Sequence, residues 1–254
     1  MKKHRWFAAL AVMVMALAVA GCSDGSSGNE FATGSSGESG NSSGAGNSGV
    51  DYSKCVVGDF VLKDGTILSK DKTPEKDTVA AVIVRADTLT KPALGVGIVH
   101  SETGLAWCTD SAEGYSINIT DLQGSTTSGY TDGSDGWEKL KKACSDTESN
   151  PENYPAWNYC RNYGANNGLE GDLATGWYLP TVAELDTIYQ NKDTVDASLS
   201  KAGGSQFVSD YYKSCCQHPS ANSFALILSF YYNGILGGLS KDSSEYVCSV
   251  RAFN

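Results

Sequence analysis

The apolar and polar positions divide this chain into three stretches. An unbroken apolar run extends from Trp6 to Ala20, and residues 23–50 then hold nine serines and eight glycines with almost no large apolar side chain. From Cys55 onwards, apolar residues recur with the spacing of strands and helices. The pattern predicts an export signal at residues 1–21, a tether at 22–54, a β-rich segment at 55–134 and a second folded segment at 135–254.

The sequence pattern from Cys55 onwards is typical of an antiparallel sheet. Residues 59–62 and 66–68 are predicted strands, and the Asp64-Gly65 pair between them favours a hairpin because Asp-Gly is a preferred tight turn. Three further strands are predicted, at residues 79–85, 94–99 and 104–108. An ordered domain is therefore expected to begin at Cys55.

Helical periodicity begins at Asp135. Asp135 and Glu138 predict an N-terminal capping pair for a helix whose core-facing stripe is Trp137, Leu140 and Cys144. A second helix is predicted at residues 156–163, because Pro155 suits the first position of a helix. We expect four tryptophans to lie in the core: Trp107, Trp137, Trp157 and Trp177.

The most distinctive stretch is residues 176–185, GWYLPTVAEL. Pro180 disfavours helical backbone at the residue before it, and Thr181 and Glu184 have the spacing of a capping box, in which each side chain bonds to the backbone N–H of the other residue. The apolar stripe behind the box predicts a helix that runs to about Asn191.

The last fifty residues return to the period of strands. Strands are predicted at residues 207–209, 224–232 and 246–253, and Asn233-Gly234 is predicted to form a two-residue turn. Within the second of these strands, alternate residues share one face: Phe224, Leu226, Leu228 and Phe230. Helices followed by an antiparallel sheet predict an α+β fold.

The N-terminal segment predicts export to the cell envelope. Three basic residues precede an apolar run that is too short to span a bilayer. The run ends in Val19-Ala20-Gly21-Cys22, which resembles the bacterial lipobox and implies that Cys22 is diacylated and becomes the mature N-terminus. Ser23 favours the outer membrane by analogy with enteric bacteria, and hence display at the cell surface. The alternative is an ordinary secretory signal followed by a chance cysteine.

The charge of the chain excludes nucleic acid as a partner. Residues 1–21 hold three of the 19 basic residues and none of the 29 acidic ones, so the remaining chain has a net charge of −13. No cluster of Lys and Arg offsets this charge, and an acidic surface repels phosphate backbones. The simplest consequence of the charge is solubility.

A series of landmarks runs through the second half of the chain: Gly176-Trp177-Tyr178-Leu179-Pro180-Thr181, Gly203-Gly204, Tyr211-Tyr212, Ser214 and Val250-Arg251-Ala252-Phe253. The series, over residues 135–253, resembles the C-type-lectin-like domain of bacterial surface lipoproteins related to the C-terminal domain of the Legionella collagen-like adhesin, particularly spirochaete members. The resemblance implies a C-type-lectin-like fold, related to that of formylglycine-generating enzymes, with an N-terminal β-rich extension. It also implies a non-enzymatic module that binds matrix or host glycan or protein.

The resemblance places the candidate ligand surface in the C-terminal segment. Family members usually have Trp-Ser-Ser where this chain has Lys213-Ser214-Cys215. In this difference the chain resembles the target proteins of diversity-generating retroelements, in which the side chains on a fixed sheet vary. The candidate ligand-binding residues are Tyr212, Lys213, Cys215, Cys216, His218, Ile227, Tyr231, Tyr232, Ile235 and Cys248. The alternative for this set is ordinary sheet packing, which is the favoured interpretation of Leu226 and Phe230.

Seven cysteines remain after Cys22, so up to three disulfides are possible outside the cytoplasm and one thiol stays unpaired. Their spacing leaves the connectivity open. By analogy with the fold, bonds are expected between Cys144 and Cys160, and between Cys248 and either Cys215 or Cys216.

The chemistry of the remaining motifs favours neither catalysis nor a metal. His100 and His218 have no acid or serine partner motif, which argues against a hydrolase triad. The Cys215–His218 segment with Cys248 offers zinc or copper ligands, but vicinal cysteines reach one tetrahedral site with difficulty, and the acidic turn at 132–136 lacks the spacing of a calcium loop. We therefore expect no enzyme activity, cofactor or metal. The alternatives are a formylglycine-generating-type oxidoreductase and a structural envelope protein without a specific ligand.

Overall fold

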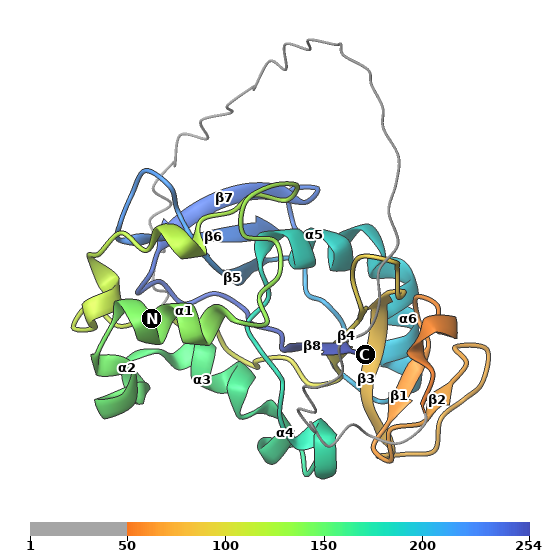
Figure 1. Cartoon of the computed structure of the whole chain (residues 1–254). Helices are drawn as coiled ribbons and strands as arrows, with labels where there is room; N and C mark the ends of the chain where they lie inside the picture. The colour runs from red at the N-terminus through yellow and green to blue at the C-terminus, as the bar shows by residue number, and fades with distance from the viewer. Residues whose placement is uncertain (1–49) are drawn as a thin grey trace, which may run out of the picture. The chain divides into compact units, whose positions relative to one another are not determined.

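The structure is a computed structural model that describes residues 50–254 (Figure 1). The predicted export signal, the lipidation site Cys22 and the tether up to residue 49 lie outside the described residues. Within the described part of the chain, no helix combines the length and the apolar character needed to cross a membrane.

Five strands from both ends of the described chain form one antiparallel sheet. In spatial order they are β2 (Ile67–Leu68), β1 (Phe60–Leu62), β3 (Val79–Arg85), β4 (Ala93–Gly97) and β8 (Val250–Phe253). The β1–β2 hairpin is confirmed, and Gly65 in its turn has a φ of 86°, which glycine adopts at low cost. Because β8 pairs with β4, the C-terminal residues complete the sheet that the N-terminal part begins.

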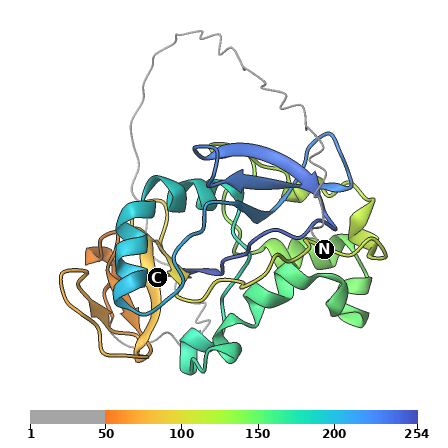
Figure 2. The same ribbon diagram turned by 180° about the vertical axis from the view of Figure 1, so that it is seen from behind.

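A second antiparallel sheet contains β5 (Tyr211–Gln217), β6 (Phe224–Ser229) and β7 (Ile235–Ser240), with β6 in the middle. Figures 1 and 2 show this sheet far from the β1–β2 hairpin, with α5 (Val182–Gln190) between them. The strands predicted at residues 104–108 and 207–209 are wrong. Leu105 forms only an isolated bridge with Glu245, so the chain there crosses the fold as an irregular segment.

Helical segments cover both faces of the five-stranded sheet. The side chains of β3 alternate, as a regular strand requires: Val82 and Val84 pack with apolar residues of α5 and α6 (Lys192–Lys201). On the other face, Ala81 and Ile83 pack with residues of α4 (Tyr163–Asn166) and of the 3-10 helix η5 (Gly171–Ala174). The sheet is therefore buried on both sides at β3, which explains why this strand is apolar from Val79 to Val84.

A third core lies between the three-stranded sheet and the helices α1 (Gly136–Ala143) and α3 (Pro155–Arg161), and the short helix α2 (Asp146–Ser149) connects these two helices. Trp107 and Trp157 meet edge to face with ring centroids 5.2 Å apart, and Trp137 meets Tyr154 in the same way at 6.1 Å. The predicted burial of the four tryptophans is confirmed. Three short 3-10 helices border this core: η2 (Glu113–Tyr115), η3 (Thr120–Leu122) and η4 (Pro151–Asn153).

The capping box at the start of α5 is confirmed, whereas the one predicted for α1 is wrong. Thr181 Oγ1 accepts from Glu184 N at 3.2 Å, and Glu184 Oε2 accepts from Thr181 N at 2.8 Å. Asp135 precedes α1 but makes no side-chain hydrogen bond to the helix N-terminus. Its carboxylate instead accepts from the Tyr130 hydroxyl at 3.0 Å and pairs with Lys139, one turn along the helix.

The folded region starts before Cys55, the residue at which the sequence places it. A 3-10 helix, η1 (Tyr52–Lys54), precedes Cys55, and Tyr52 is buried. The Tyr52 ring lies 5.3 Å from that of Phe253, and its hydroxyl donates to Gly65 O at 3.1 Å. With helices and antiparallel sheets together, the described chain is α+β, as predicted.

Candidate functional site

Six of the ten candidate ligand-binding residues lie in the core and do not reach the surface. They are Tyr212, Lys213, Cys215, Cys216, Ile227 and Cys248. The sequence interpretation of these six as ligand contacts is corrected by their burial. Diversification at these positions would alter the packing of the core rather than a binding surface.

The burial of β5 has a structural cause that its sequence does not reveal. One side of the strand pairs with β6, while Tyr212 and Gln217 on the same strand form isolated parallel bridges with Tyr246 and Gln123. Cys215 N also donates to Pro180 O at 2.8 Å. Chain segments from three distant parts of the sequence therefore cover the strand, and its polar side chains point into the protein.

The other candidates include three of the four exposed apolar residues around the turn between β6 and β7, a set that we name the tip patch: Tyr231, Tyr232, Ile235 and Leu236. The side chains of Tyr231, Tyr232 and Ile235 are 60%, 52% and 50% exposed. These four residues make up half of the eight large apolar residues that are exposed in residues 50–254. Leu236 was not among the sequence candidates. Exposed apolar side chains that form a contiguous patch are typical of interaction surfaces.

Local contacts hold the tip patch in one shape. The Tyr231 and Tyr232 rings meet edge to face with centroids 4.5 Å apart, and Tyr232 N donates to Ser229 Oγ at 2.9 Å. Phe230, between the strand and the exposed tyrosines, points inward and packs on Tyr189 of α5 at 5.2 Å. The patch is therefore a pair of exposed aromatic rings on a hairpin that is anchored to a helix.

The turn of this hairpin is longer than predicted but uses the predicted residues. β6 ends at Ser229, so five residues connect it to β7, and Asn233 and Gly234 both have left-handed backbone, with φ of 52° and 72°. Glycine accepts this conformation at low cost. At Gly234 a Cβ atom would also lie 2.7 Å from the Tyr189 ring, so only glycine fits against α5 there.

We expect Gly234→Ala to destabilise the protein by about 2–4 kcal/mol, because it adds backbone strain and a collision with Tyr189. Gly168→Ala is the matched control: Gly168 has a φ of 63°, but no atom lies within 4 Å of its would-be Cβ. Chemical denaturation of both variants separates the two effects. Equal losses of stability would show that the contact with α5 does not hold the hairpin.

The two histidines lie apart from the tip patch. His218 is half-buried beside Gly238, near the other end of β7, and accepts from Ser220 N at 3.1 Å. Its partial burial lowers its pKa. His100 is buried with its ring 4.3 Å from that of Phe207, and burial lowers its pKa to about 3. Both imidazoles are therefore neutral at physiological pH, and neither faces a carboxylate or a hydroxyl nucleophile in the manner of a catalytic triad.

All seven cysteines between residues 50 and 254 are buried free thiols, so the predicted disulfides are corrected. Cys248 lies in the core formed with α5 and α6, whereas Cys215 and Cys216 lie in the core next to α1 and α3. The neighbour of Cys248 is instead Cys160, whose Sγ donates to the Cys248 carbonyl at 3.5 Å. The predicted bond from Cys248 to Cys215 or Cys216 is wrong because these cysteines belong to different cores, whereas Cys144 and Cys160 share a core and are nevertheless both free thiols.

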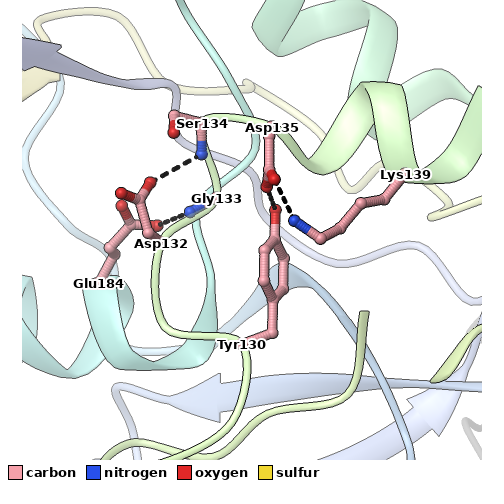
Figure 3. A network of polar contacts seen from close by, with 7 residues as sticks. All are labelled: Tyr130, Asp132, Gly133, Ser134, Asp135, Lys139 and Glu184. Atoms are coloured by element: carbon pink, nitrogen blue, oxygen red, sulfur yellow. Dashed lines mark hydrogen bonds and ion pairs between the residues drawn. The ribbon is translucent and has the colours of Figure 1, made fainter. Parts of the chain in front are cut away.

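A polar network fixes the acidic turn that precedes α1, as Figure 3 shows. Glu184 Oε2 accepts from Gly133 N at 3.2 Å, and Asp132 Oδ1 accepts from Ser134 N at 3.0 Å. The carboxylates of this turn are thus used for internal hydrogen bonds. In the described part of the chain, no three His, Cys, Asp or Glu side chains gather as a metal-ligand set.

Two buried lysines are further polar residues of the core: Lys213, a candidate from the sequence, and Lys241, which no sequence pattern indicated. Lys213 Nζ donates to Ser240 O at 3.2 Å, and Lys241 Nζ donates to Gln217 Oε1 at 3.1 Å and lies 4.6 Å above the Trp107 ring. Burial lowers the pKa of each ammonium to about 8. Neither forms an ion pair within residues 50–254.

Comparison with known proteins shows a likeness in fold. No family model matches this chain, and no curated protein matches it. The fold resembles that of a bacterial fimbrial protein. That protein, from Bacteroides ovatus, aligns with a TM-score of 0.55 and 16% sequence identity over 78% of this chain. This chain spans about half of that protein, 49% of its length, so the likeness concerns the fold alone.

Proposed function

We propose that this protein is a non-enzymatic, adhesin-like binding module displayed on a bacterial cell surface, and that the tip patch contacts its ligand. The observation that carries the proposal is the gathering of Tyr231, Tyr232, Ile235 and Leu236 on one anchored hairpin. Large exposed aromatic side chains with few rotamers supply binding energy at low entropic cost, and they dominate many interfaces.

The location rests on two independent supports. The likeness in fold to a fimbrial protein supports a location at the cell surface, although a sequence identity of 16% is too low to infer a shared function. The lipobox-like Val19-Ala20-Gly21-Cys22 supports attachment to the membrane through a lipid on Cys22, with outer-membrane display. Labelling with a palmitate analogue tests the anchor: Cys22→Ala should lose the label, and a variant that keeps it would contradict the lipid attachment.

The expected ligand is a host or matrix glycan or protein with an uncharged contact surface. Tyrosine rings stack on the apolar faces of sugars and also pack on protein surfaces, and the tip patch contains no charged side chain. Because the chain after residue 21 carries a net charge of −13, we expect neutral glycans to bind in preference to sulfated ones. The C-type-lectin-like resemblance of residues 135–253 is compatible with either class of ligand.

The proposal is tested by presenting the lipid-free chain from Ser23 to matrix proteins and to neutral and sulfated glycans. We expect saturable binding that falls at least about tenfold in a Tyr231→Ser, Tyr232→Ser double variant, since exposed aromatic anchors carry binding energy without supporting the core. Leu89→Ser is the matched control, because Leu89 is fully exposed and outside the tip patch. Equal losses in both variants would contradict a specific role for the tip.

The screen also separates the alternatives. A structural envelope protein would bind nothing in the screen. An oxidoreductase of the formylglycine-generating type would bind nothing and would instead oxidise a peptidyl thiol in the presence of copper. Either result would overturn the binding-module proposal.

A further inference from the structure

The backbone of β5 is irregular where it carries two adjacent cysteines. Lys213 pairs with Ile227 and Gln217 pairs with Ala225, so three residues of β5 stand opposite one residue of β6. Consecutive side chains of a regular strand point to opposite faces, whereas Cys215 and Cys216 both belong to the core next to α1 and α3. The irregular stretch therefore turns two adjacent thiols toward the same side.

Hydrogen bonds fix this irregular stretch. Cys215 N donates to Pro180 O at 2.8 Å, Cys216 N donates to Ser214 Oγ at 3.1 Å, and Ser214 Oγ donates to Leu226 O at 2.7 Å. Interaction with the Cys215 thiol lowers the pKa of Cys216, and burial raises the pKa of Cys215. The thiols are thus unequal, with Cys216 the more acidic of the two.

The pair lies beneath the loop that Figure 3 shows. Cys216 Sγ is 3.8 Å from Tyr130 O, and the loop is held by the Tyr130 hydroxyl bond to Asp135 and by the Gly133 bond to Glu184. This loop is one of several segments that cover the pair, and Pro180 covers it as well through the bond from Cys215 N. Cys160 and Cys248 lie on separate elements, α3 and the segment before β8, and are 88 residues apart in the sequence.

We propose that Cys215 and Cys216 are a vicinal dithiol site that small-molecule disulfides oxidise to a disulfide between the two adjacent residues. The Cys216 thiolate attacks one sulfur of the small disulfide, and the other sulfur leaves and takes up a proton as a thiol. The Cys215 sulfur, after losing its proton to water, then attacks the Cys216 sulfur and releases the second small thiol. The protein loses two electrons and two protons, which the small disulfide gains as two thiols.

The test uses the lipid-free chain from Ser23, reduced, exposed to oxidised glutathione, then denatured and alkylated. Trypsin releases residues 214–241 as one peptide, which contains Cys215 and Cys216 and no other cysteine. We expect this peptide to be unalkylated and lighter by two hydrogen atoms, while the peptide with Cys160 is alkylated. Two alkylated cysteines in peptide 214–241, or a bond from it to Cys248, would overturn the proposal.

A second measurement does not depend on the rate of oxidation. Phenylarsine oxide condenses with two neighbouring thiols and releases water, so the reduced chain should bind one equivalent through Cys215 and Cys216. Cys215→Ala and Cys216→Ala should each lose this binding, and Cys160→Ala, which removes an equally buried thiol, should keep it. Undiminished binding in both Cys215→Ala and Cys216→Ala would also overturn the proposal. Neither measurement involves the ligand of the tip patch.

Discussion

Replacing Glu184 with alanine is expected to lower the free energy of unfolding by about 4 kcal/mol or more. The fully buried carboxylate accepts from Thr181 N at 2.8 Å, the Tyr178 hydroxyl at 2.8 Å and Gly133 N at 3.2 Å. Alanine would leave three buried donors without a partner, at about 1–3 kcal/mol each, and would remove half of the capping box. Glu184 thus joins the start of α5 to the turn before α1.

The loss is measured by urea unfolding followed by tryptophan fluorescence. Gln190→Ala, an exposed position in the same helix, is the control and should change stability by less than about 0.5 kcal/mol. Glu184→Gln retains one acceptor oxygen but turns an amide N–H₂ toward backbone donors. Its loss of stability should therefore lie between the losses of Gln190→Ala and Glu184→Ala. A Glu184→Ala protein as stable as the control would show that these hydrogen bonds contribute little.

Replacing Lys241 with methionine is expected to change the dependence of stability on pH. Burial lowers the pKa of Lys241 from 10.5 to about 8, so between these values the unfolded chain binds a proton that the folded chain does not. The contribution of Lys241 to stability therefore rises with pH across this window, by as much as about 3 kcal/mol in total. A methionine side chain does not titrate, so this contribution to the pH dependence is absent from Lys241→Met.

Relative to the wild type, we expect Lys241→Met to be close to neutral at pH 7 and destabilised by about 2 kcal/mol at pH 10. At pH 7 the substitution removes a buried charge, which stabilises the protein. This gain offsets the free energy lost when Gln217 Oε1 and Gly114 O no longer accept hydrogen bonds from Lys241. Unfolding is measured at both pH values with a non-thiol reductant, which keeps the thiols reduced, and the thiols and tyrosines that titrate are common to both proteins. Lys142→Met, at an exposed position of α1, should keep a constant difference from the wild type. A constant difference for Lys241→Met would contradict the lowered pKa.

Features that depend on a few neighbouring residues were predictable from the sequence. The capping box of Thr181 and Glu184 and the hairpin around Asp64-Gly65 form as expected, and Asn233 and Gly234 adopt left-handed backbone, although in a longer turn than predicted. Each is determined by backbone preferences and hydrogen bonds within about four residues. The sequence did not reveal the other partners of Glu184, because Gly133 is 51 residues away in the sequence.

The candidate site was predicted less well because burial is set by distant segments. Lys213, Cys215 and Cys216 were assigned to the ligand surface by the family resemblance, yet segments near Gln123, Pro180 and Tyr246 enclose their strand. Tyr231, Tyr232 and Ile235 were identified correctly as surface residues, since they follow the end of a buried strand and flank a turn. Only the three-dimensional structure separates these two groups.

Hydroxyl-radical footprinting of the lipid-free chain, with and without a ligand identified in the binding screen, tests the role of the tip patch most directly. Side chains covered by a ligand are oxidised more slowly, and mass spectrometry reports each residue. We predict slower oxidation of Tyr231, Tyr232 and Ile235 in the complex, with no change at Leu89, which is also exposed. Unchanged oxidation of the tip patch, with protection at another surface, would contradict its assignment as the binding surface.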